Sequence, residues 1–278
     1  MLRAADVSFS YGDEPVVSGV SLDVAAEGFV GIIGPNGSGK TTLLRLLAGT
    51  RTPQKGDVSL DGRSLRTMRR AEVARRMAVV PQETHLAFEY SVLEVVLMGR
   101  YPHLGAFAVE GPSDLAVARK ALAATGTLEL EARPFSTLSG GEKQRVIIAA
   151  ALAQITQGVL LLDEPTAALD LKYQLGVAAL LRSLHAAHNL AVVVSTHDLN
   201  FAAGLCNTLV MLKKGRVLAA GPVEEVLTAA RVRELYDVDA EVARHPRTGQ
   251  LTVTPLHPVA EHPVAQDFGP AERSAGCK

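Results

Sequence analysis

A glycine-rich run at residues 34–42 holds the residue types whose spacing most clearly indicates chemistry. It reads GPNGSGKTT and fits the pattern G-x-x-x-x-G-K-[ST]. Its glycines keep side chains away from successive backbone N–H groups, which can then wrap an anion. A helix expected to start at Lys40 points its positive end at that anion, Lys40 adds a charge for the β- and γ-phosphates, and the Thr41 hydroxyl can ligate Mg²⁺. The run therefore predicts an ATP or GTP site that is contacted by Gly34, Pro35, Asn36, Gly37, Ser38, Gly39, Lys40, Thr41 and Thr42.

Two carboxylates close an apolar run further along the chain. Residues 159–162 are followed directly by Asp163, Glu164 and Pro165. Charged residues are costly in a core, but they fit at the carboxyl end of a parallel strand, where such sheets bind ligands. Asp163 is suited to hold Mg²⁺, directly or through water, and Glu164 to polarise an attacking water. Taken alone, the pair would be an ordinary acidic turn; beside the glycine-rich run it predicts nucleotide hydrolysis.

A second glycine motif, Ser139-Gly140-Gly141-Glu142, precedes a helix that we expect to begin near Lys143. Such a motif at a helix N-terminus is another nest for an anion. One chain has little use for two nests on one terminal phosphate. A head-to-tail dimer would solve this, because each copy's second motif could cap the nucleotide on the other copy's loop.

These motifs, in this order, resemble those of the ATP-binding-cassette (ABC) ATPases over about residues 1–240. The resemblance implies that Gln82 contacts Mg²⁺ and the attacking water and senses a permease. It implies that His197 contacts the γ-phosphate, that Asp170 belongs to a loop at the nucleotide site, and that Tyr11 stacks on adenine. Glu164, His197 and Gln82 would be catalytic.

The same resemblance assigns Thr41, Gln82 and Asp163 to Mg²⁺, and Ser139, Gly140, Gly141 and Glu142 to the nucleotide. One position departs from the family pattern, since Glu142 stands where many members have Gln. This departure leaves the preceding serine and glycines unchanged, so we expect the nucleotide site to be functional.

Residues 88–103 and 169–174 resemble the branch of this family that powers iron–siderophore, haem and cobalamin importers. That branch implies two copies of the chain, two membrane permease subunits, indirectly a substrate-binding protein, and a place on the cytoplasmic face of the inner membrane. An exporter subunit with the same chemistry remains an alternative. So does a non-transport ATPase of translation or DNA repair, although such proteins usually carry two cassettes or a long coiled coil.

The elements that must position these residues follow from apolar periodicity. Strand patterns are expected at residues 2–9, 16–24, 29–33, 57–60, 79–80, 159–162, 190–194 and 208–212, and a helix at 40–48. Alternating strands and helices predict an α/β fold: an ABC-type P-loop core with a mainly parallel sheet, a small antiparallel β subdomain and an inserted helical subdomain. The main lobe would comprise residues 1–85 and 157–240, and the helical subdomain 86–156. Residues 241–278 would be an extension that frays beyond about residue 255.

Composition excludes some other classes of function. The 278 residues carry 28 basic and 29 acidic side chains, and this balance argues against a nucleic-acid partner. Residues 146–162 are uncharged and approach the length of a membrane span, but polar residues at 154, 156 and 157 interrupt them. We therefore expect a buried helix, a polar turn and a buried strand there.

Overall fold

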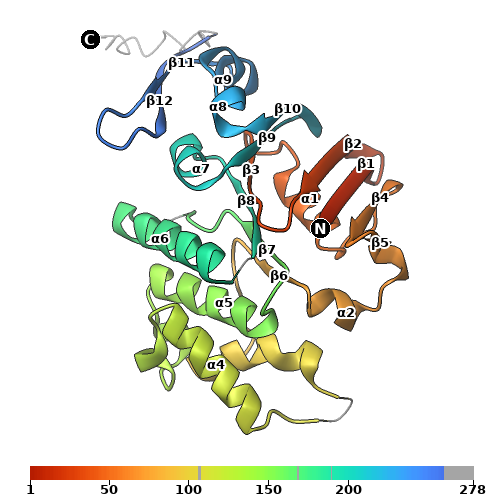
Figure 1. Cartoon of the computed structure of the whole chain (residues 1–278), viewed down its shortest axis with the longest axis vertical. Coiled ribbons are helices and arrows are strands. Elements are labelled where there is room, and N and C mark those ends of the chain that lie inside the picture. The colour runs from red at the N-terminus through yellow and green to blue at the C-terminus, as the bar shows by residue number, and fades with distance from the viewer. Residues whose placement is uncertain (106–107, 168, 189, 260–278) are drawn as a thin grey trace, which may run out of the picture.

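The computed structural model describes residues 1–105, 108–167, 169–188 and 190–259 (Figure 1). Its central sheet has six strands in the order β10-β9-β3-β8-β7-β6. The strands are β3 (Phe29–Ile33), β6 (Met77–Val80), β7 (Val159–Asp163), β8 (Ala191–Thr196), β9 (Thr208–Lys213) and β10 (Arg216–Pro222). All neighbours pair in parallel except β10, which forms an antiparallel hairpin with β9. Every residue of β3, β7 and β8 is buried, as expected for a parallel sheet that is covered on both faces.

One face of the central sheet packs against α1 (Lys40–Leu47) and a four-stranded antiparallel sheet in the order β2-β1-β4-β5. The strands of this second sheet are β1 (Leu2–Tyr11), β2 (Glu14–Val24), β4 (Lys55–Leu60) and β5 (Arg63–Ser64). The turn η1 (Leu65–Thr67) and the short helix α2 (Arg70–Ala74) connect it to β6. The predicted antiparallel β subdomain is confirmed, and each predicted strand lies within two residues of its observed bounds.

The opposite face packs against α5 (Gly140–Gln154), α6 (Leu171–His188) and α7 (Leu199–Leu205). Helix α5 also contributes to a separate helical core with α3 (Val92–Leu97) and α4 (Pro112–Ala124). The 3₁₀ turns η2 (Met98–His103), η3 (Leu128–Leu130) and η4 (Phe135–Thr137) complete this region, which lies at the bottom of Figure 1. Residues 86–156 are thus mostly helical, as predicted. Among the helices described, none is long and apolar enough to cross a membrane.

The C-terminal part differs from the prediction. After α8 (Val223–Val226) and α9 (Ala229–Tyr236), the chain forms an antiparallel hairpin of β11 (Val238–Arg244) and β12 (Leu251–Pro258). The prediction placed no element after residue 240 and a frayed chain beyond about 255. The hairpin is ordered because Ala240 and Val253 are buried in the core that includes α7 and α9. The predicted fraying of residues 260–278 lies outside the described residues.

Candidate functional site

The glycine-rich run forms the loop between β3 and α1. Gly39 ends it with φ +100°, and a Cβ at this position would lie 2.6 Å from the Val16 carbonyl oxygen, so only glycine fits. The Lys40 ammonium donates to the carbonyl oxygens of Gly34 at 2.9 Å and Pro35 at 3.2 Å. The Ser38 hydroxyl is buried and has no hydrogen-bond partner among the described residues. A buried hydroxyl of this kind fits a loop that is shaped for a polar ligand.

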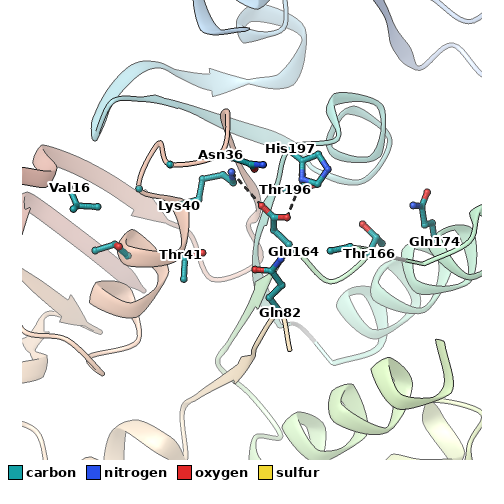
Figure 2. Close-up of a pocket in the computed structure, with 14 residues that line it drawn as sticks. Val16, Asn36, Lys40, Thr41, Gln82, Glu164, Thr166, Gln174, Thr196 and His197 are labelled. Carbon is teal, nitrogen blue, oxygen red and sulfur yellow. Dashed lines mark hydrogen bonds and ion pairs between the residues drawn. The ribbon is translucent and has the colours of Figure 1, made fainter. Parts of the chain in front are cut away.

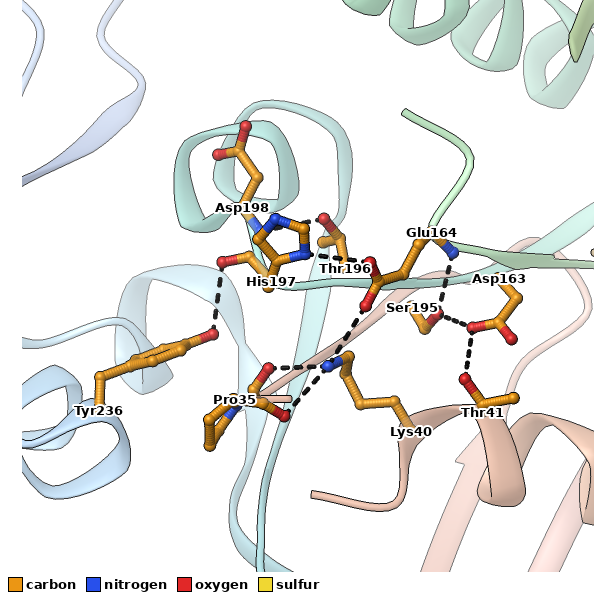
Figure 3. A network of polar contacts seen from close by, with 11 residues as sticks. Pro35, Lys40, Thr41, Asp163, Glu164, Ser195, Thr196, His197, Asp198 and Tyr236 are labelled. Carbon is orange, nitrogen blue, oxygen red and sulfur yellow. Dashed lines mark hydrogen bonds and ion pairs between the residues drawn. The ribbon is translucent and has the colours of Figure 1, made fainter. Parts of the chain in front are cut away.

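Asp163 lies at the carboxyl end of β7, directly beside Ser195 of β8 in the parallel register. Its Oδ1 accepts hydrogen bonds from the Ser195 hydroxyl at 2.6 Å and from the Thr41 hydroxyl at 3.1 Å (Figure 3). Both bonds end on the same oxygen, so Oδ2 keeps its lone pairs for a further partner. Thr41 and Asp163 are 122 positions apart in the sequence, and the sheet order brings them together.

Glu164 adopts a left-handed backbone conformation with φ 46°, which is uncommon for a residue other than glycine. Its N–H donates to the Ser195 carbonyl oxygen at 3.0 Å, which anchors the strained residue to β8. Its Oε1 lies 3.4 Å from the Lys40 Nζ, and its Oε2 lies 3.1 Å from the His197 Nδ1. The Lys40 and Glu164 side chains are only 5% and 12% exposed. The carboxylate therefore bridges two groups predicted to contact phosphate, and strain of this kind is typical of functional sites.

A cavity of about 610 Å³ opens above this network. Figure 2 shows Glu164 near its centre, between Lys40 and His197, with Gln82 beside it. The predicted residues in its wall are Asn36, Gly37, Gly39, Lys40, Thr41, Thr42, Gln82, Glu164 and His197. Catalytic and phosphate-loop candidates from four separate stretches of sequence thus meet around one cavity.

Sequence reasoning missed other wall residues, namely Val16, Thr166, Ala167, Gln174 and Thr196. Thr166 and Thr196 lie within two positions of predicted catalytic residues, and this proximity was an available signal. Val16 comes from β2, and no local pattern indicates its place at the site.

Tyr11 does not belong to the cavity wall. Its ring packs edge-on against Phe9 with the centroids 5.0 Å apart, and the Arg51 guanidinium lies 5.9 Å from the ring centroid. Hydrogen bonds from Arg45 and then Thr42 lower the pKa of the Tyr11 phenol. Since Thr42 itself lines the cavity, Tyr11 stands beside the site, and its predicted stacking on adenine stays a prediction.

Comparison with known proteins gives a family for this site. A family model described as ABC transporter matches residues 17–167, which contain the phosphate loop, Gln82, the second glycine motif and Glu164. The hemin import ATP-binding protein HmuV of Thermobifida fusca is 43% identical over 256 residues, covering 92% of this chain and 89% of that protein. The chain belongs to the ABC transporter family.

Two further similarities agree with this membership. The cobalamin import ATP-binding protein BtuD of Halobacterium salinarum is 45% identical over 227 residues, which is 82% of this chain. The chain spans only 56% of the length of that relative. Among solved structures, a metal-chelate type ABC transporter in an inward-facing conformation matches with a TM-score of 0.81 and 31% identity, over 92% of this chain and 97% of that one. The predicted family and fold class are confirmed.

The second glycine motif of this ABC protein lies outside the wall of the cavity. Helix α5 begins at Gly140 and not near Lys143, because Ser139 caps it and brings both glycines into its first turn. The Glu142 carboxylate accepts from the Ser139 N–H and hydroxyl, each at 2.8 Å, and these bonds lower the pKa of Glu142. The S-x-x-E spacing of residues 139–142 is a capping-box pattern, which indicates a helix start at Gly140.

The ring of Tyr173, from α6, packs directly on Gly141. A Cβ at Gly141 would lie 2.4 Å from the tyrosine ring, so glycine is needed for this contact. Asp170, three residues earlier, is exposed at the start of α6 and does not line the cavity. The second motif and the Asp170 region thus pack together, apart from the phosphate loop of the same chain.

Oxygen ligands for Mg²⁺ are available at one place in the site. Thr41, Gln82 and Asp163 line a second cavity of about 270 Å³. A hydroxyl, an amide carbonyl and a carboxylate are the hard donors that Mg²⁺ takes together with phosphate oxygens. The residues present therefore fit the predicted metal.

Proposed function

We propose that this chain is the ATP-hydrolysing subunit of an importer for an iron chelate or cobalamin. One observation carries the hydrolytic part: Glu164 is held between Lys40 Nζ at 3.4 Å and His197 Nδ1 at 3.1 Å, beside the phosphate loop. This arrangement supports a role for Glu164 as general base, for Lys40 as a phosphate-binding ammonium and for His197 as a γ-phosphate contact.

In this proposal the phosphate-loop residues 34–42 hold the phosphates of ATP. Lys40 leaves Glu164 and turns to the β- and γ-phosphates, which frees the carboxylate to accept a proton from the attacking water. The strained backbone of Glu164 and its anchor on Ser195 keep that carboxylate in place. His197 contacts the γ-phosphate, and Gln82 contacts the attacking water. Mg²⁺, bound by Thr41 and Asp163 with Gln82 beside it, would offset charge on the phosphate oxygens.

The second glycine motif supports a head-to-tail dimer. Ser139, Gly140 and Gly141 lie outside the cavity wall of their own chain, and Ser139 and Gly140 are exposed. In the proposed dimer, these residues, with Glu142 and Asp170, face the nucleotide that the other copy holds. Residues 86–156 then form the helical subdomain that carries the motif to the partner.

Transport is proposed from the names of the relatives. Those names describe hemin and cobalamin import, and the structural neighbour is a metal-chelate type transporter. We therefore propose two permease subunits as partners, with an external substrate-binding protein, and a place on the cytoplasmic face of the inner membrane. Gln82 is exposed at the cavity and would report nucleotide occupancy to the permease.

Hydrolysis is tested with the full chain and with Lys40→Ala and Glu164→Gln. We expect the wild type to hydrolyse ATP with Mg²⁺, Lys40→Ala to lose nucleotide affinity, and Glu164→Gln to bind ATP and accumulate as a closed dimer. Wild-type turnover by Glu164→Gln would refute the assignment of the base. Unchanged ATP binding by Lys40→Ala would refute the role of the loop.

The cargo is tested by uptake of radiolabelled siderophore, haem and cobalamin in cells with and without the gene. Loss of uptake of one of them in the deletion, restored by wild type but not by Glu164→Gln, would support import. Unchanged uptake of all three would refute the cargo class while leaving the ATPase assignment intact. Recovery of the chain with ribosomes or DNA in place of membrane subunits would favour the non-transport alternative.

A further inference from the structure

His197 lies on a short loop that has contacts of its own outside the nucleotide site. The loop lies between the buried end of β8 at Thr196 and the start of α7, where Asp198 caps the helix by accepting from the Phe201 N–H at 2.9 Å. The Asp198 N–H in turn donates to the Thr196 hydroxyl oxygen at 3.0 Å. The position of His197 therefore depends on where α7 is held.

One polar side chain of α7 bonds to the C-terminal hairpin, in addition to the apolar core that they share. Asn200, in the first turn of α7, donates from Nδ2 to the Val253 carbonyl oxygen at 3.1 Å and accepts the Val253 N–H on Oδ1 at 2.7 Å. Both backbone groups of Val253 are thus paired with one amide, in the way that a neighbouring strand would pair with β12. Val253 itself is buried, so this contact joins α7 to the folded part of the hairpin.

A second contact reaches His197 from α9. The Tyr236 hydroxyl donates to the His197 carbonyl oxygen at 3.4 Å (Figure 3). Burial raises the pKa of this phenol, while a hydrogen bond from the Gly34 backbone lowers it; burial is the larger effect, so the phenol stays protonated and able to donate. Tyr236 therefore stands between the first residue of the phosphate loop and the histidine loop.

Apolar packing and polar contacts both join α7 to the hairpin, since Ala202 of α7 and Val253 of β12 lie in one buried core. A cavity of about 300 Å³ separates them in part, and it is lined by residues of the His197 loop, α7, α9, β11 and β12, including His197, Tyr236 and Val253. The hydrogen bonds of Asn200 to Val253 and of Tyr236 to His197 join residues that line this cavity.

We propose that α9 and the β11–β12 hairpin form a brace for His197, in which Asn200 and Tyr236 are positioning residues for the hydrolytic site. The brace sets the backbone of the His197 loop so that Nδ1 meets the Glu164 carboxylate. This inference rests on the proposed function for its effect on hydrolysis. Its structural part, the control of His197 by the C-terminal hairpin, stands without that function.

The test uses the full chain with Asn200→Ala and Tyr236→Phe, and Arg244→Ala as control. Arg244 pairs with Glu224 on the surface of the hairpin and leaves both brace contacts intact. We expect kcat for ATP hydrolysis to fall about tenfold in Asn200→Ala and about threefold in Tyr236→Phe, because sub-ångström displacement of a catalytic group lowers kcat. KM for ATP should stay within about twofold of wild type, and Arg244→Ala should match wild type.

A double-mutant cycle separates positioning from simple loss of stability. In a His197→Ala background the brace variants should lower the residual rate no further, because the group they position is gone. The brace is refuted if both variants keep wild-type kcat, or if they lower the rate equally with and without His197.

A second measurement does not depend on hydrolysis. In ¹³C-histidine NMR of the full chain, the His197 ring signal is assigned by its absence in His197→Ala. It should shift or broaden in Asn200→Ala and Tyr236→Phe and stay unchanged in Arg244→Ala. An unmoved His197 signal in both brace variants would overturn the inference. If the wild type did not hydrolyse ATP, the proposed function would be refuted. The His197 ring signal would still test whether the hairpin positions His197.

Discussion

If Lys40 binds phosphate as proposed, Glu164 competes with that phosphate, and replacing Glu164 by glutamine should tighten the binding of ADP. In the structure Lys40 Nζ lies 3.4 Å from Glu164 Oε1, and both side chains are largely buried. A phosphate that takes Lys40 must first end this ion pair. Glutamine keeps a carbonyl oxygen for Lys40 but carries no charge, so the competitor becomes weaker without leaving the ammonium unpaired. ADP is the ligand of choice, since it lacks the γ-phosphate that would close a dimer.

The expected size follows from the distance. At 3.4 Å and an effective dielectric constant of about 20, the gross attraction between the two charges is about 5 kcal/mol, of which desolvation offsets most. The remaining difference between a charged and a neutral acceptor is about 1 kcal/mol. We therefore expect the Kd for ADP to fall about fivefold in Glu164→Gln.

The assay is a calorimetric titration of ADP into wild type, Glu164→Gln and His197→Ala. The last variant is the control, because it removes the other partner of Glu164 at 3.1 Å and leaves the Lys40 ion pair in place. Its Kd should stay within about twofold of wild type, less than the effect of losing one charged contact. Equal or weaker ADP binding by Glu164→Gln would show that the ion pair does not oppose the nucleotide. So would an equal gain in His197→Ala.

Three further predictions concern other parts of the chain. Helices α3 and α5 begin with matching capping boxes, Ser91 with Glu94 and Ser139 with Glu142. Ser91→Ala and Ser139→Ala should each lower the free energy of unfolding in urea by about 1 kcal/mol, and only Ser139→Ala should lower ATPase activity. Equal losses of activity would contradict the role of the second motif. Gly141→Ala should cost about 1–3 kcal/mol of stability because its Cβ meets the Tyr173 ring, and Tyr173→Leu in the same chain should recover part of this; full additivity of the two changes would refute the contact. Hydrogen bonds from the Gly111 backbone and from Arg100 lower the pKa of Asp114, so the carboxylate stabilises the fold above its unfolded pKa of about 3.9 and loses that effect as pH falls below it. The Tm gap between wild type and Asp114→Asn should accordingly narrow between pH 6 and about pH 3, and a gap independent of pH would contradict it.

The C-terminal hairpin marks the limit of prediction from patterns. Strand β12 alternates over residues 251–254, but Pro255 and Pro258 follow at once and most of its residues are exposed, so the short pattern alone does not predict an ordered strand. The hairpin is ordered by contacts with α7 and α9, which lie earlier in the chain. The place of Tyr236 could not be predicted either. Its neighbours are the phosphate loop and the His197 loop, and no local pattern around residue 236 indicates these contacts.

Local residue patterns were enough to predict the glycine-rich loop and the acidic pair that follows a buried strand. A backbone φ of +100° at position 39 requires glycine, and a strand buried on both faces requires the apolar run that ends at Asp163. Both features can therefore be recognised in the sequence. Tertiary packing brings Lys40 to Glu164 and Glu164 to His197 across 33 positions, and it sets the hairpin against α7. The reason is physical: periodicity and turn chemistry act over a few residues, whereas strand order and side-chain convergence are fixed by packing between distant segments.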